Sequence, residues 1–134
     1  MKRPFYAVAL LFTWCFLTGM SQPPQGEVPT PSVNISATFI DDQGISTHCQ
    51  EVSWEGKVFF TGTRGKGIVA IPFEKVKRVV FVGEVRGGKR DAQVTLMNGE
   101  VVAVTFDGEA RLYGMTSYGS YRIAVKNLKE IVFE

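Results

Sequence analysis

His48 and Cys49 are the residues of this chain whose types could perform nucleophilic catalysis. His48 is the one histidine of the sequence, and Cys49 follows it directly. A thiol–imidazole pair works only when both side chains lie within hydrogen-bond distance of each other. Adjacent residues of a strand point to opposite faces, so we expect these two side chains to diverge. The sequence therefore predicts no catalytic residue, and we expect a protein that is not an enzyme.

The same residues do not make a metal site. A tetrahedral zinc site would need two carboxylates from elsewhere in the chain. Asp41 and Asp42 stand before Gly44, but the spaced acidic ligands and the distal glutamate of a calcium loop are missing, which favours a plain turn. The lysine–glycine turns of the chain lack the strand–loop–helix context of phosphate loops. We predict no metal and no cofactor.

Three tyrosines form the first candidate binding site. Tyr113, Tyr118 and Tyr121 cluster around Gly114 and Gly119. Exposed tyrosines between glycines can stack on a sugar ring or contact a partner protein. The alternative is that these side chains complete the core of a small β-barrel.

A basic segment forms the second candidate. Arg86, Lys89 and Arg90 lie in the sequence RGGKRD, close after Lys75, Lys77 and Arg78. Such a segment could bind an anionic polymer or lipid headgroups. The alternative is a solvated hairpin, in which lysines discourage edge-to-edge association of sheets.

The first 21 residues resemble a secretory signal. Lys2 and Arg3 precede an apolar run over residues 5–17, and Gly19 and Ser21 suit cleavage before Gln22. The alternative is an uncleaved inner-membrane anchor, although the run is shorter than the roughly 20 residues that span a bilayer. We expect a periplasmic or secreted protein that contacts a membrane only if this segment is retained.

The charge balance argues against nucleic acid as a partner. The chain has 15 lysine and arginine residues and 13 aspartate and glutamate residues. Removal of Lys2 and Arg3 with the signal would leave 13 of each sign. A neutral domain lacks the electropositive surface that binds nucleic acid, so the expected partners are an envelope protein or a glycan. Cys49 would then be the only cysteine, without a disulfide partner, and we expect it to be buried.

From residue 32 onward the pattern predicts strands and turns rather than helices. Apolar residues alternate or form short runs interrupted by Gly, Asn and Asp. The predicted strands are 33–40, 45–54, 57–61, 68–73, 79–82, 93–97, 100–106, 110–113, 120–125 and 131–133. Hairpin turns are expected at residues 42–44, 55–56, 98–99 and 107–108. Pro72 lacks an N–H, so its strand should lie at a sheet edge or a bulge.

Two stretches of the sequence repeat each other. Residues 62–82 and 114–134 align without a gap, with 6 identities in 21 positions. The identical pairs, 52 residues apart, are turn glycines, apolar positions and a surface lysine, such as Gly62/Gly114 and Lys77/Lys129. Each copy also has a lone apolar residue, Val76 or Leu128, where one 3₁₀ turn would precede the last strand. This indicates a duplicated structural unit, and any site should lie where the copies differ.

The predicted fold is all-β, with two tandem units of about 50 residues that each resemble a small SH3-like or Sm-like barrel and pack together; the alternative is one larger merged barrel or sandwich. The expected organisation is a signal peptide (1–21), a proline-rich linker (22–31), a first unit (32–85), a hinge (86–91) and a second unit (92–134). The first repeated stretch contains Ile71-Pro72-Phe73 and closes with Phe81 and Val82. In this pattern it resembles a repeat of small exported bacterial proteins of unknown function. The resemblance implies an envelope location and no defined activity. We therefore expect a binding or assembly module of the bacterial cell envelope, or alternatively a membrane-tethered structural accessory subunit.

Overall fold

The computed structural model of the chain describes residues 33–134, so the predicted signal peptide and linker lie outside the described residues. The described part consists of ten strands and two 3₁₀ turns. They are β1 (Ala37–Asp41), β2 (Ser46–Trp54), β3 (Phe59–Arg64), β4 (Gly67–Pro72), η2 (Phe73–Lys75), β5 (Val76–Arg86), β6 (Lys89–Leu96), β7 (Val101–Asp107), β8 (Arg111–Thr116), β9 (Gly119–Ala124), η3 (Val125–Asn127) and β10 (Leu128–Phe133).

The ten strands form one curled antiparallel sheet, which confirms the all-β prediction. Its order is β4-β3-β7-β6-β5-β10-β1-β2-β8-β9. Each predicted strand overlaps an observed one. The reason is that side chains of a strand alternate between its two faces: in β2, Thr47 and Cys49 are buried while their neighbours are exposed. The two 3₁₀ turns also lie directly before β5 and β10, as predicted.

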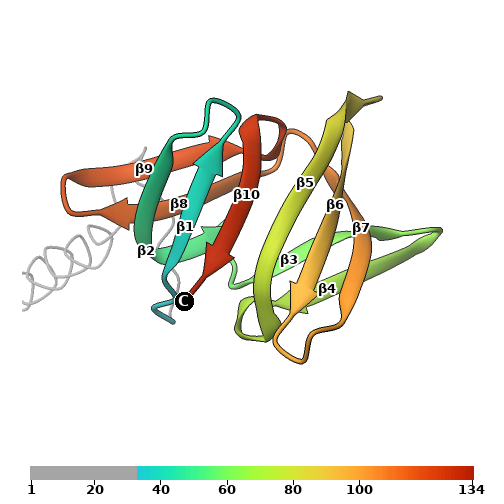
Figure 1. Cartoon of the computed structure of the whole chain (residues 1–134), viewed down its shortest axis with the longest axis horizontal. Coiled ribbons are helices and arrows are strands. Elements are labelled where there is room, and N and C mark those ends of the chain that lie inside the picture. The colour runs from blue at the N-terminus through green and yellow to red at the C-terminus, as the bar shows by residue number, and fades with distance from the viewer. Residues whose placement is uncertain (1–32) are drawn as a thin grey trace, which may run out of the picture.

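The strand order differs from the two tandem barrels expected from the sequence. β2 pairs with β8 rather than with β3, and β3 pairs with β7 and β4. Each half of the sheet therefore contains strands from both parts of the chain (Figure 1). The β8–β9 hairpin extends from one end of the molecule and the β3–β4 hairpin from the other.

The physical reason lies in two turns that were expected to close hairpins. Glu55 has a positive φ of 52°, its N–H donates to Arg111 O at 3.0 Å, and its Oε1 accepts from Arg111 N at 2.7 Å. These bonds hold the end of β2 against β8. The turn at residues 55–56 closes a single antiparallel bridge, in which Trp54 and Lys57 exchange backbone hydrogen bonds of 2.7 and 2.9 Å, and β3 then continues without pairing with β2. The turn at residues 107–108 likewise joins strands that do not pair, since Gly108 N donates to Gly88 O at 2.8 Å. The other two predicted turns do connect paired strands, β1 with β2 and β6 with β7.

Residues 86–91, expected to be a hinge, form the tip of the β5–β6 hairpin. Arg86 pairs with Lys89 across Gly87 and Gly88. Both glycines have positive φ, 57° and 78°, as a tight two-residue hairpin turn requires. The segment is thus part of the sheet and continues its ladder.

The centre of the sheet is the antiparallel pair β5–β10. Val79 lies opposite Ile131, its counterpart 52 residues later, so the register is symmetric about this pair. Arg78 and Glu130 are also counterparts, and Arg78 Nη1 lies 3.4 Å from Glu130 Oε2. The reversal of charge between the two similar stretches of sequence therefore places opposite charges, rather than like ones, beside the symmetric pair.

One apolar core joins the two halves of the sheet. Phe60 of β3 contacts aromatic rings from β2, η2, β7 and β10 at centroid distances of 4.7–5.9 Å. The repeated Gly62 and Gly114 lie within strands instead of in the expected turns. At Gly114 a Cβ atom would lie 2.6 Å from Cys49 Cβ, so only glycine permits β8 to approach β2 this closely.

Candidate functional site

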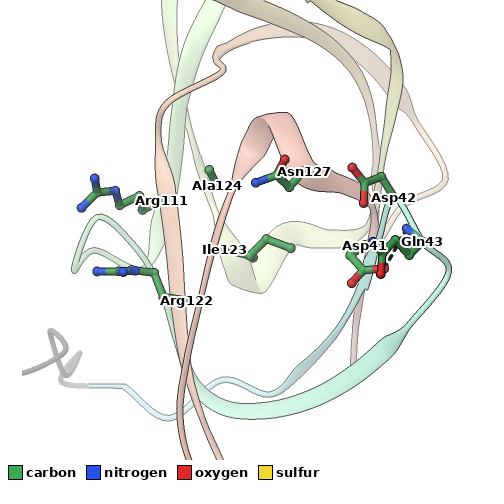
Figure 2. Close-up of a pocket in the computed structure, with 8 residues that line it drawn as sticks. All are labelled: Asp41, Asp42, Gln43, Arg111, Arg122, Ile123, Ala124 and Asn127. Carbon is green, nitrogen blue, oxygen red and sulfur yellow. Dashed lines mark hydrogen bonds between the residues drawn. The ribbon is translucent and has the colours of Figure 1, made fainter.

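A hollow of the described surface lies between the β1–β2 turn and β9 (Figure 2). It has a volume of about 550 Å³ and is open to solvent. Its lining residues are Asp41, Asp42, Gln43, Arg111, Arg122, Ile123, Ala124 and Asn127. None of these eight residues has a hydroxyl, thiol or imidazole that could serve as a nucleophile or as a histidine base.

The acidic side of this hollow is a structural turn. Asp41 Oδ1 accepts hydrogen bonds from Gln43 N and Ile45 N, both at 2.9 Å. The N–H of Asp42 donates to Asn127 O at 3.0 Å, which fastens the turn to η3. The Asp41 carboxylate is therefore occupied in holding its own loop.

The two arginines of the hollow belong to the outer face of the β8–β9 hairpin. Leu112 and Ile123 pair with each other and are buried. Because side chains alternate along a strand, Arg111 and Arg122 point to the other side. Figure 2 shows both guanidinium groups directed away from Ile123 and from the aspartates. The carboxylates and guanidinium groups thus line the hollow without converging on one point.

Tyr113 lies on the same outer face as these arginines. It pairs directly with Arg122 across the hairpin and is two residues from Arg111 on β8. Both arginines are exposed, while Tyr113 is half-buried. Within residues 33–134 neither guanidinium has a salt bridge or a side-chain hydrogen bond. We call Arg111, Tyr113 and Arg122 the Arg–Tyr face.

The structure does not bring the three predicted tyrosines into one cluster. Tyr121 pairs with Gly114 on the inner face of the hairpin and stacks on Phe39 at 5.8 Å. Burial raises the pKa of Tyr121, against the opposing effect of a hydrogen bond to Thr47. Tyr118 lies in the turn at the hairpin tip and is 80% exposed. Tyr121 is thus a packing residue, and Tyr113 and Tyr118 are the ones available to a partner.

The predicted basic residues are also separated. Arg86 and Lys89 are exposed at the tip of the β5–β6 hairpin. Arg90 instead points inward, where its Nη1 donates to Val125 O at 2.8 Å and to Leu128 O. Burial lowers the pKa of the Arg90 guanidinium, while the charge of Asp42 raises it. Arg90 therefore fastens β6 to η3, and two rather than three of these charges face solvent.

His48 and Cys49 lie on opposite faces of β2, as strand alternation predicts. His48 Nδ1 is exposed and 3.2 Å from Glu134 Oε1. Cys49 is fully buried, as expected, and burial raises its pKa to about 11. Because the unfolded thiol ionises near pH 9, this group's contribution to stability is complete below pH 9 and declines as the pH rises toward 11. The folded thiol is neutral at physiological pH and does not act as a nucleophile.

Residues 33–134 contain neither a cluster of metal-binding side chains nor a membrane-spanning helix. No cluster of three or more His, Cys, Asp or Glu residues in this part of the chain is arranged to hold a metal ion. None of its helical segments is long and apolar enough to cross a membrane.

Comparison with known proteins gives a family for the chain. A family model described as "Uncharacterised protein" matches residues 31–134. The chain belongs to this family. Neither the curated proteins nor the solved structures contain a match.

Arg111 and Arg122 are functional candidates that the sequence did not reveal. They are 11 residues apart in the chain and do not belong to a basic cluster. The available signal was the 52-residue repeat, in which their counterparts are Phe59 and Ala70. A comparison of the two copies for gained charge, combined with alternation around Tyr113, would have grouped all three residues.

Proposed function

We propose that this protein is a non-enzymatic binding module of the bacterial cell envelope, and that the Arg–Tyr face binds an anionic glycan. The observation that carries the proposal is the pair of exposed guanidinium groups beside Tyr113, neither of which has a carboxylate partner in residues 33–134. Unpaired arginines on a surface are free to neutralise an anion from outside the chain.

The chemistry of the face suits acidic sugars. A guanidinium group presents planar, paired N–H donors that match a carboxylate or a phosphate. A tyrosine ring offers an apolar surface with a polar tip, on which a sugar ring can stack. Both strands of the hairpin are held in the sheet through the β2–β8 pairing, so the three side chains project from a fixed backbone.

The comparison of the two repeated stretches supports this assignment. We propose that the chain is a duplication of one five-stranded unit, interlaced in the sheet, with β3–β4–η2–β5 corresponding to β8–β9–η3–β10 at a spacing of 52 residues. The counterparts of Arg111, Tyr113 and Arg122 are Phe59, Thr61 and Ala70. The Arg–Tyr face is thus a property of the second copy, whereas shared residues serve the scaffold.

A charge-removal series tests the proposal. With immobilised polygalacturonate as the probe, we expect Arg111→Gln and Arg122→Gln each to weaken binding about fivefold, and the double variant about 25-fold, because each exposed ion pair contributes roughly 1 kcal/mol. Binding should also fall with rising salt. The measurement is a binding isotherm at two salt concentrations, with neutral dextran as the negative probe.

Lys89→Gln is the matched control, because it removes one exposed charge from the other predicted basic site. It should leave the affinity unchanged. If Lys89→Gln weakens binding and Arg122→Gln does not, the site lies at the β5–β6 tip instead. Equal binding to dextran and polygalacturonate would refute recognition of an anion.

We also propose export to the periplasm or beyond, with removal of residues 1–21; the alternative is retention as an inner-membrane anchor of a structural accessory subunit. The apolar run over residues 5–17 supports export, and its 13 residues are few for a bilayer span. The expected intact mass of the exported protein is that of a chain beginning at Gln22. A mass that includes Met1 would favour the anchored alternative.

A further inference from the structure

The β4 edge of the sheet is a second surface, at the opposite end of the strand order from the β8–β9 hairpin. β4 has β3 as its single neighbour, and Phe73 N donates to Val58 O at 3.0 Å just beyond their ladder. Hydrogen-bonding direction alternates along an antiparallel strand, so Ile68, Ala70 and Pro72 direct their backbone groups outward. Pro72 has no N–H, and its missing donor falls on this outer side, which agrees with its predicted edge position.

The composition of this edge is unusual for an exposed strand. Residues 67–73 read GIVAIPF, without a charge, and Ile68 is 84% exposed. Protein edges are commonly protected by charged side chains, and the other edge strand, β9, contains Arg122. An uncharged edge with outward N–H and C=O groups is a template for another strand.

We propose that β4 pairs with β4 of a second copy of this chain, antiparallel and centred on Ala70. In this register Ile68 lies opposite Pro72 of the second copy, which covers the exposed isoleucine with an apolar ring. The outward N–H groups of Ile68 and Ala70 donate to the second copy's Pro72 O and Ala70 O. The missing N–H of Pro72 limits the ladder to its central residues.

Charge complementarity favours a second copy over an unrelated strand. The same register brings Lys66, at the tip of the β3–β4 hairpin, toward Glu74 of the second copy, twice per dimer. Both residues are exposed, and in residues 33–134 neither has a salt bridge or side-chain hydrogen bond. The sheet already contains a pairing of this symmetry, since Val79 and Ile131 face each other at its centre. Two copies joined at β4 would continue one sheet through both chains.

Sedimentation velocity tests the proposal. A pairing of five residues from each chain, 68–72, buries little surface, so we expect a reversible monomer–dimer equilibrium between about 10 and 500 μM. Ile68→Lys places two like charges in the new ladder and should raise the dimer dissociation constant at least about tenfold. Ser120→Lys, at the counterpart position on β9, is the matched control and should leave that constant unchanged.

Charge exchange tests the register itself. Lys66→Glu and Glu74→Lys should each weaken the dimer several-fold, because each places like charges together, and the double variant should restore it. A chain that stays monomeric at about 500 μM overturns the proposal and leaves the β4 edge to a different protein. A double variant that fails to recover overturns the register, and an equal loss in Ser120→Lys assigns the contact to β9.

Discussion

Replacement of Phe60 by alanine is expected to lower the free energy of unfolding by about 3–5 kcal/mol, the largest effect of any single change considered for this chain. The Phe60 ring is fully buried. It lies 5.3 Å from the ring of Trp54, 4.7 Å from Phe73, 5.7 Å from Phe106 and 5.9 Å from Phe133. Its removal leaves a cavity where strands of both halves of the sheet meet, and rigid aromatic neighbours cannot refill it.

Phe59→Ala is the matched control for this experiment. Phe59 precedes Phe60 in β3 but is only half-buried, with Lys57 Nζ 5.5 Å from its ring centre. We expect it to lose about 1 kcal/mol, because much of its side chain already contacts water. Urea unfolding followed by tryptophan fluorescence measures both variants. Equal losses at the two positions would show that Phe60 does not join the halves of the core.

Replacement of Gly62 by alanine is expected to destabilise the protein by about 1–3 kcal/mol, as overpacking of a close contact does. A Cβ atom on Gly62 would lie 2.7 Å from Val104 Cγ1 and 2.8 Å from Thr105 O. Thr105 O is a backbone atom, so it cannot rotate away from the new methyl group. β3 would have to move away from β7, and their single paired position, Thr63 with Thr105, would weaken.

Gly67→Ala provides the control in the same hairpin. Its new Cβ would meet Arg64 O at 3.6 Å, an ordinary contact. The substitution also reduces the freedom of the unfolded chain, so we expect a change between zero and a gain of about 1 kcal/mol. The prediction for Gly62 would be wrong if both alanine variants had the urea midpoint of the parent chain.

The strands and turns of this protein could be predicted because their signals are local. Alternating apolar residues or short apolar runs identified every strand, and the spacing around Val76 and Leu128 identified the two 3₁₀ turns. The pairing could not be predicted in the same way. Residues 55–56 and 107–108 have the composition of hairpin turns. The first closes only the Trp54–Lys57 bridge, and the second joins strands that do not pair, because the chain at these turns is bonded to Arg111 and Gly88, which are distant in the sequence.

The candidate site likewise combines residues that local sequence reveals with contacts between distant residues that it does not reveal. Tyr113 was singled out because tyrosines cluster in the sequence, yet Tyr121 of that cluster packs inward. Arg90 belongs to the densest basic segment of the sequence, yet it donates to the carbonyls of Val125 and Leu128. Arg111 and Arg122 come together only through the β8–β9 register. In a hairpin, residues that share one face of the two paired strands are therefore better candidates for a common binding site than residues that lie close together in the sequence.

The interlaced strand order has a consequence for how this chain can acquire its structure. A polypeptide is synthesised from its N-terminus. β2 therefore cannot pair with β8, nor β3 with β7, until these later strands have been made. The last strand, β10, enters between β5 and β1, in the middle of the sheet. Long sequence separation between partners slows folding and leaves strand edges unpaired meanwhile. The chain therefore cannot complete its sheet until β10 has emerged, and a deletion of residues 128–133 would remove the centre of the structure rather than its margin.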